Sequence, residues 1–107
     1  MSNQAEFIDR IAFIEKKLHE RGVKNFISYQ GVCDNLAERH RLQFSNGYIC
    51  SIVLLKVANP DNKLETCLMH CDTDRILTDD VVRVRNDIVI VDIAKSISQL
   101  TERHYED

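Results

Sequence analysis

Apolar residues follow two different periods along this chain, and the change of period separates the predicted elements. The apolar positions between residues 3 and 21 recur at steps of three and four: Phe7, Ile11, Ile14 and Leu18. This spacing places them on one face, so an amphipathic helix is predicted over residues 3–21. Gly22 follows directly, and glycine is the residue type that most often ends a helix in the left-handed conformation.

From residue 41 to residue 71 the pattern changes to three runs rich in β-branched, aromatic and aliphatic residues. Two turn signals separate the runs, Asn46-Gly47 and Asn59-Pro60-Asp61-Asn62. Because both central residues of a type I′ turn need positive φ, Asn-Gly favours a two-residue hairpin in which Ser45 pairs with Tyr48. The sequence therefore predicts a three-stranded antiparallel meander over residues 41–71.

The predicted register sorts the side chains of the meander onto two faces. The expected core face carries Leu42, Phe44, Ile49, Val53, Leu55, Val57, Leu64 and Leu68. A sheet wetted on its second face should be polar there, but the centre of this second face is apolar. Its central side chains are Tyr48, Ile52, Leu54 and Met69, with Cys50, Cys67 and Cys71 beside them. Such a face must be covered by the chain's own segments, by a second copy of the chain or by a foreign protein.

The segments on either side of the meander are less regular. Residues 24–40 are expected to form a connector, with a short strand over 25–29 and a short helix over 32–40 as options. Residues 87–103 have helical spacing with Asn86 or Asp87 as a possible N-cap, although the β-branched run 88–91 also permits a strand at the start. The predicted order is helix, connector, three strands, loop and helix, which is an α+β two-layer fold in a single domain over residues 1–107.

Composition and charge exclude several classes of protein. The hydrophobic fraction of 44% and the charged fraction of 29% are those of an ordinary folded domain. The net charge of −3, without a Lys/Arg cluster, argues against binding to nucleic acid. No apolar run approaches the roughly 20 residues of a bilayer span, and the amino terminus lacks the pattern of a signal peptide. No membrane partner is expected, and a cytoplasmic location is predicted, in which the cysteines are reduced thiols.

No residue cluster matches a catalytic, cofactor or metal pattern. Cys67, His70 and Cys71 are close in sequence, but alternation along a strand sends His70 to the face opposite the two cysteines. The aspartates of residues 72–80 lack the glycine and closing glutamate of a calcium loop. Glycine-rich nucleophile elbows and phosphate loops do not occur. No catalytic residue, cofactor or metal is therefore assigned, and a small enzyme of another type is the third alternative for function.

The hairpin region carries the motif F-x-N-G-Y-x-x-S-[VI], which runs from Phe44 to Ile52. In this motif the chain resembles a group of small bacteriophage proteins that share it. The likeness continues through Leu64-Glu65-Thr66 and Asp80-Val81 to the last helix, whereas Ile49-Cys50 stand where small residues are usual. The resemblance implies a phage or prophage origin and brings no active site with it.

Two hypotheses for function follow. The first is a non-enzymatic protein-interaction module, in the phage setting a factor that binds and modulates or inhibits a host protein, for example one of a defence system. Its predicted contact surface has Tyr48, Ile52, Leu54 and Met69 as apolar anchors and an acidic rim that includes Asp72 and Asp74. The alternative is a self-associating protein in which the same sheet face closes a two-fold homodimer.

Overall fold

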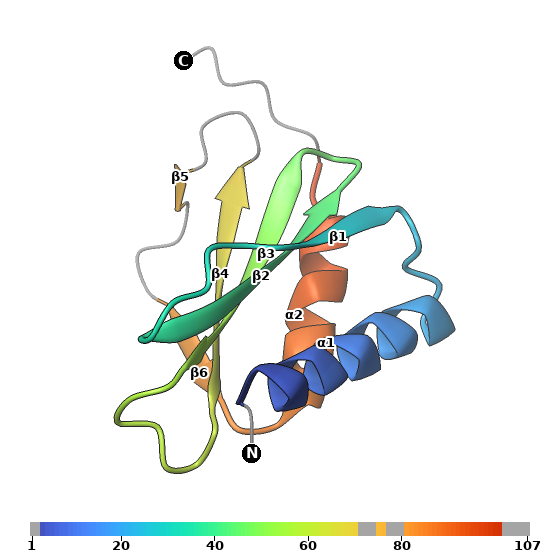
Figure 1. Cartoon of the computed structure of the whole chain (residues 1–107). Helices are drawn as coiled ribbons and strands as arrows, with labels where there is room; N and C mark the ends of the chain where they lie inside the picture. The colour runs from blue at the N-terminus through green and yellow to red at the C-terminus, as the bar shows by residue number, and fades with distance from the viewer. Residues whose placement is uncertain (1–2, 71–74, 77–80, 102–107) are drawn as a thin grey trace.

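In this computed structural model, two helices pack on one face of an antiparallel sheet (Figure 1). The structure describes residues 3–70, 75–76 and 81–101. The helices are α1 (Asn3–Glu20) and α2 (Asp87–Ser98). The strands are β1 (Phe26–Gln30), β2 (Ala37–Phe44), β3 (Tyr48–Leu55), β4 (Leu64–His70), β5 (Arg75–Ile76) and β6 (Val82–Val84). The α+β class predicted from the sequence is confirmed.

The sheet is larger than the predicted three-stranded meander. Its strands follow the order β1-β2-β3-β4, and the short strands β5 and β6 both pair with the outer edge of β4. β1 confirms the option of a short strand over residues 25–29 to within one residue. The option of a helix over residues 32–40 was wrong, because residues 37–40 begin β2. Strands of two or three residues, such as β5 and β6, are too short to show a period in the sequence.

Helix α1 ends one residue before the predicted boundary. Gly22 has φ of +83°, Gly22 N donates to His19 O at 3.0 Å and Val23 N donates to Leu18 O at 2.8 Å. These two bonds form a Schellman motif, in which a left-handed glycine satisfies the last carbonyl groups of a helix. Val23 and Leu18 are both buried in the core, so the motif also turns the chain from α1 toward β1.

Helix α2 begins where the capping signal predicted. Asn86 Oδ1 accepts a hydrogen bond from Ile88 N at 3.0 Å, and the helix starts at Asp87, so the alternative of a strand over residues 88–91 was wrong. The buried face of α2 carries Ile90, Val91, Ala94 and Ile97. Packing of this face on the sheet outweighs the weak helix propensity of its β-branched residues.

The hairpin between β2 and β3 turns through three residues and not through the two that Asn-Gly predicted. Gly47 N donates to Phe44 O at 3.0 Å, and Leu42 pairs with Cys50. Gly47 has φ of +89°, while Asn46 does not have positive φ. This geometry is a type I turn followed by a left-handed glycine, which is the usual three-residue hairpin loop.

A difference of one residue in the turn exchanges the two faces of β3. The predicted sorting of the β3 side chains was therefore wrong. The core between the sheet and the helices contains Leu42, Phe44, Tyr48, Cys50, Ile52, Leu54 and Leu64. Of the side chains predicted to join Leu42 and Phe44 in the core, Ile49, Val53 and Leu55 lie on the face away from the helices, and Val57 is exposed. Leu64 is in the core as predicted, and Leu68 packs against it.

Candidate functional site

The side chains predicted to anchor a partner lie in the core of the chain itself. Tyr48, Ile52 and Leu54 are buried in the cluster that includes the inner faces of α1 and α2. The sheet face to which they belong is therefore covered by the chain's own helices. They are not available as a contact surface or as a homodimer face, because the register of the hairpin turns them inward.

Met69 does not share a face with those three residues. It pairs with Ile49 in the register of β3 and β4 and forms a small buried cluster with Ile49 and Cys67 on the face opposite the helices. The same face carries Arg39, Arg41, Gln43 and Glu65 on neighbouring register positions. Asp72 and Asp74, the predicted rim, lie outside the described residues.

The two buried thiols of the sheet are on opposite faces. Burial raises the pKa of Cys50 to about 12, against a weaker opposing effect from the hydroxyl of Thr66, which lies 3.2 Å from Cys50 Sγ. Burial likewise raises the pKa of Cys67, with Ser51 and then Arg41 opposing it. Neither thiol is therefore a reactive thiolate near neutral pH. Within the described ranges, no three His, Cys, Asp or Glu side chains are placed to hold a metal ion.

A more distinctive arrangement is found at the loop of residues 31–36, between β1 and β2. Val32 and Leu36 in this loop are 73% and 62% exposed, and Val57, which follows β3, is 62% exposed. Lys56 N donates to Leu36 O at 2.9 Å, so the chain around Val57 lies against this loop. We call Val32, Leu36 and Val57 the loop patch.

Hydrogen bonds between Asp34 and the residues that follow it fix the turn of the loop. Asp34 Oδ1 accepts from Leu36 N at 2.8 Å and from Ala37 N at 3.0 Å, and Asp34 N donates to Ala37 O at 3.1 Å. The bonds from Leu36 and then Ala37 lower the pKa of Asp34. An aspartate that bonds to the backbone two and three residues later stabilises a turn by itself.

Arg39 and Cys33 tie the other half of the loop to β2. Arg39 Nη1 donates to Val32 O at 3.0 Å and pairs with Asp34 Oδ2 at 3.3 Å. Cys33 Sγ accepts from Arg39 N of β2 at 3.5 Å and from Gln30 Nε2 of β1 at 3.1 Å. Gly31 N donates to Arg39 O at 2.9 Å. A Cβ added at Gly31 would lie 3.2 Å from the Cβ of Arg39, so glycine permits the close approach of the two chain segments.

A buried ion pair fastens the inner side of the loop. Lys56 Nζ lies 2.7 Å from Glu38 Oε1 and donates to Asp34 O at 2.8 Å. Glu38 is only 3% exposed, and the nearby Cys33 thiol and then Lys56 lower its pKa. Among the described residues, Glu38 Oε2 has no hydrogen-bond partner.

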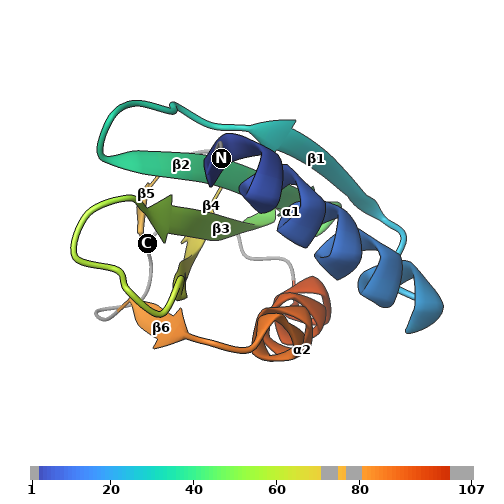
Figure 2. The ribbon, with the colours of Figure 1, turned by 60° about the horizontal axis from the view of Figure 1, so that its bottom comes forward.

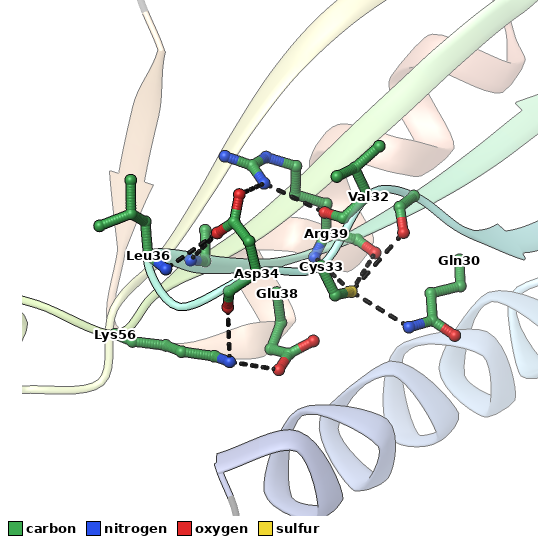
Figure 3. Close-up of polar contacts among 10 residues, drawn as sticks. Gln30, Val32, Cys33, Asp34, Leu36, Glu38, Arg39 and Lys56 are labelled. Atoms are coloured by element: carbon green, nitrogen blue, oxygen red, sulfur yellow. Dashed lines mark hydrogen bonds and ion pairs between the residues drawn. The ribbon is translucent and has the colours of Figure 1, made fainter.

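The loop therefore has two unlike sides. Figure 3 shows the Glu38 carboxylate pointing toward α1, whereas the side chains of Val32 and Leu36 point away from it. The inner side borders a cavity of about 80 Å³, lined by Phe7, Ile8, Ile11, Gln30, Cys33, Glu38 and His40. Burial lowers the pKa of His40, so this imidazole is neutral near pH 7, and its Nε2 lies 2.5 Å from Ser28 Oγ.

The chemistry of this site favours recognition. A polar framework holds a short loop in one conformation, and that loop presents aliphatic side chains to solvent. Sequence reasoning missed the loop because Val32 and Leu36 are four residues apart, a spacing that favoured the option of a short helix over residues 32–40. A signal for a turn was nevertheless present, since Asp34-Asn35 lies between the two aliphatic residues.

Two other hollows have less defined chemistry. An apolar groove of about 350 Å³ lies between β4 and α2, and it is lined by residues that include Leu68, Val89, Ile93 and Leu100. A shallow depression beside α1 has both signs of charge, with Arg10 bonded to Asp87 Oδ1 at 2.6 Å and to Asn62 O at 2.6 Å. The polar groups of this depression largely form hydrogen bonds and ion pairs with one another.

Neither described helix has the length and apolar character needed to cross a membrane. Comparisons with family models, with curated proteins and with solved structures find no significant match to this chain.

Proposed function

We propose that this protein is a non-enzymatic interaction module that binds another protein through the loop patch. The observation that carries the proposal is the combination of a hydrogen-bonded loop with exposed aliphatic side chains at its tip. Val32 and Leu36 are among the most exposed large aliphatic residues of the described chain. Isolated exposed aliphatic residues are ordinary, but these three come from two segments that the hydrogen bond from Lys56 N to Leu36 O holds together.

The rigidity of the loop favours binding. Ordering a mobile loop on association costs free energy, whereas this loop is already ordered by Asp34, Arg39 and Lys56. The charged side chains that order the loop lie on the same short segment as its aliphatic side chains, so a partner would meet both apolar and polar groups there.

The resemblance to small phage proteins gives one concrete form of the proposal. In that form the partner is a protein of a bacterial host, and the module modulates or inhibits it by occupying its surface. The location is then the host cytoplasm. The proposal replaces the anchors expected from the sequence, because Tyr48, Ile52 and Leu54 are buried in the core.

Affinity capture from a bacterial lysate with matched variants tests the proposal. Leu36→Asp and Val57→Asp each place a charge on the loop patch, and we expect each to weaken the capture of a specific partner by about tenfold or more. Leu36→Met keeps an apolar side chain and should retain the partner. Val81→Asp is a control at an exposed valine away from the loop.

All four variants should keep the far-ultraviolet circular dichroism and the melting temperature of the wild type, since the substituted side chains are exposed. Capture of the same proteins in the same amounts by the wild type, Leu36→Asp and Val57→Asp would show that the loop patch is not the contact surface.

A further inference from the structure

The outer edge of β1 has no pairing strand among the described residues. Ser45 N donates to Asn25 O at 3.1 Å, and Gly31 N donates to Arg39 O at 2.9 Å. Because hydrogen bonding alternates along an antiparallel strand, these bonds direct the backbone groups of Ile27 and Tyr29 toward β2. The N–H and C=O groups of Phe26, Ser28 and Gln30 then point away from the sheet. Figure 2 shows β1 as the outermost strand on this side.

Helix α1 leaves one of its flanks uncovered on the same side of the molecule. Arg10 pairs with Asp87 and Arg21 pairs with Asp92, so one flank of α1 faces α2. Helical geometry places Ile8, Ala12, Glu15 and His19 on the other flank. This flank lies on the β1 side, because the ring centroids of His19 and Phe26 are 5.5 Å apart and Ile8 borders the same cavity as Gln30.

Apolar side chains are exposed in both layers here. Ile8 is 58% exposed on the flank of α1, and Ala12 beside it is exposed as well. Ile27 of β1 is 66% exposed on the sheet face opposite the helices. On this side of the molecule, the helical layer and the sheet therefore both leave apolar side chains exposed that a neighbouring chain would bury.

We propose that a second copy of this chain is that neighbour, and that two copies pair through β1 in antiparallel fashion about a two-fold axis at Ser28. Ser28 then lies opposite the second copy's Ser28, and Phe26 lies opposite the second copy's Gln30. These positions carry the outward backbone groups, so each pair exchanges hydrogen bonds and the two sheets become one. Ile27 packs against the second copy's Tyr29 on the face away from the helices.

The strand is suited to pairing with itself. Its five residues, Phe26–Gln30, are uncharged, so a two-fold axis places no like charges opposite one another. Edge strands that avoid association usually carry a charge, a proline or a bulge, and β1 has none of these. A two-fold axis also requires each contact to be self-complementary, which the pairings about Ser28 satisfy.

The same axis accounts for the uncovered flank of α1. Since α1 lies over the β1 side of the sheet, joining two β1 strands brings the two α1 flanks toward each other. Ile8 and Ala12 would then be buried between the helices, and the small side chain of Ala12 permits a close approach. A foreign strand added to β1 would cover the backbone edge alone and leave Ile8 exposed. The proposed dimer does not depend on the loop patch.

The test uses the full chain in solution. Light scattering coupled to gel filtration, over about a thousandfold range of concentration, should give twice the monomer mass at the upper end of the range. The double variant Ile8→Glu with Ile27→Lys should be monomeric throughout. Val57→Lys introduces the same kind of charge at an equally exposed valine of the loop patch and should remain dimeric.

Amide hydrogen exchange tests the pairing without any variant. In the dimer, the amides of Phe26, Ser28 and Gln30 should be protected, and this protection should fall on dilution. The amides of Ile27 and Tyr29 bond to β2 and should stay protected at every concentration, which provides an internal control. A monomer at all concentrations, a dimer that persists in the double variant, or a dimer whose Ser28 amide exchanges freely would each overturn the proposal.

Discussion

The two faces of the sheet differ in how they exclude water. On the face toward the helices, Leu42, Ile52 and Leu64 have no exposed surface and belong to one cluster with α1 and α2. On the other face, the buried cluster is small, and charged residues occupy neighbouring positions, with Glu65 paired to Arg83 at 2.5 Å. Long arginine and glutamate side chains can cover apolar surface while their charged ends remain in water. The comparison shows that one sheet supports a packed core on one face and a polar cover on the other.

The largest expected effect is a difference in the free energy of unfolding between alanine substitutions at two neighbouring residues of β3, one on each face of the sheet. Ile52→Ala on the helix side should reduce the free energy of unfolding by about 2–5 kcal/mol, because it opens a cavity in a fully buried position. Val53→Ala on the other face removes a half-buried side chain, and we expect a loss of about 1 kcal/mol or less. Urea unfolding monitored by circular dichroism provides both values. Equal losses would mean that the two faces contribute alike.

A substitution in the turn between β2 and β3, which sets the faces of the β3 side chains, should have an intermediate effect on the free energy of unfolding. Asn46 Nδ2 donates to Ile97 O at 2.8 Å and to Leu100 O at 3.0 Å, and Asn46 Oδ1 accepts from Tyr48 N at 3.1 Å. Asn46→Ala removes all three bonds and should lower the free energy of unfolding by about 1–2 kcal/mol.

Asn46→Asp is a sharper control for that prediction. An aspartate keeps the acceptor for Tyr48 N but has no N–H groups for the carbonyls of α2, and its charge lies beside the negative end of the helix. It should destabilise the protein at least as much as alanine does. A stability equal to that of the wild type would show that the contact with α2 is not important for the hairpin.

Glu38 is an exception to the contrast between the faces, because it is a charged group buried on the helix side. The neighbouring thiol and Lys56 lower its pKa in the folded protein, so the folded state holds the proton less tightly than the unfolded state does. The stabilisation is therefore present above the unfolded pKa and is lost as the pH falls through the folded pKa.

Glu38→Gln should remove that part of the pH dependence. Unfolding free energies measured in urea between neutral and acidic pH should decline less steeply for the variant than for the wild type. Some slope should remain, because hydrogen bonds also lower the pKa of Asp34 in the folded protein. Parallel curves for wild type and Glu38→Gln would contradict the assignment of an ionised, stabilised carboxylate at this position.

Long elements with a clear period could be predicted from the sequence, and the proposed interaction site could not. The apolar spacing of three and four residues in α1 and the cap of α2 depend on neighbours in sequence, and both helices were placed correctly at their starts. The loop patch depends on bonds between Asp34, Arg39 and Lys56, which are separated by up to 22 residues. A sequence shows no distances between such groups.

The amino-acid sequence by itself determined where the two helices begin. It also determined that the chain forms a hairpin near Asn46-Gly47 and that both faces of β3 are largely apolar. Only the tertiary structure decided which of those faces the helices cover. The physical reason is the period of two in a strand, since one extra residue in the turn reverses every side chain that follows. Within that turn, Asn46 donates its side-chain amide to Ile97 O of α2, a partner 51 positions away that the local sequence does not reveal.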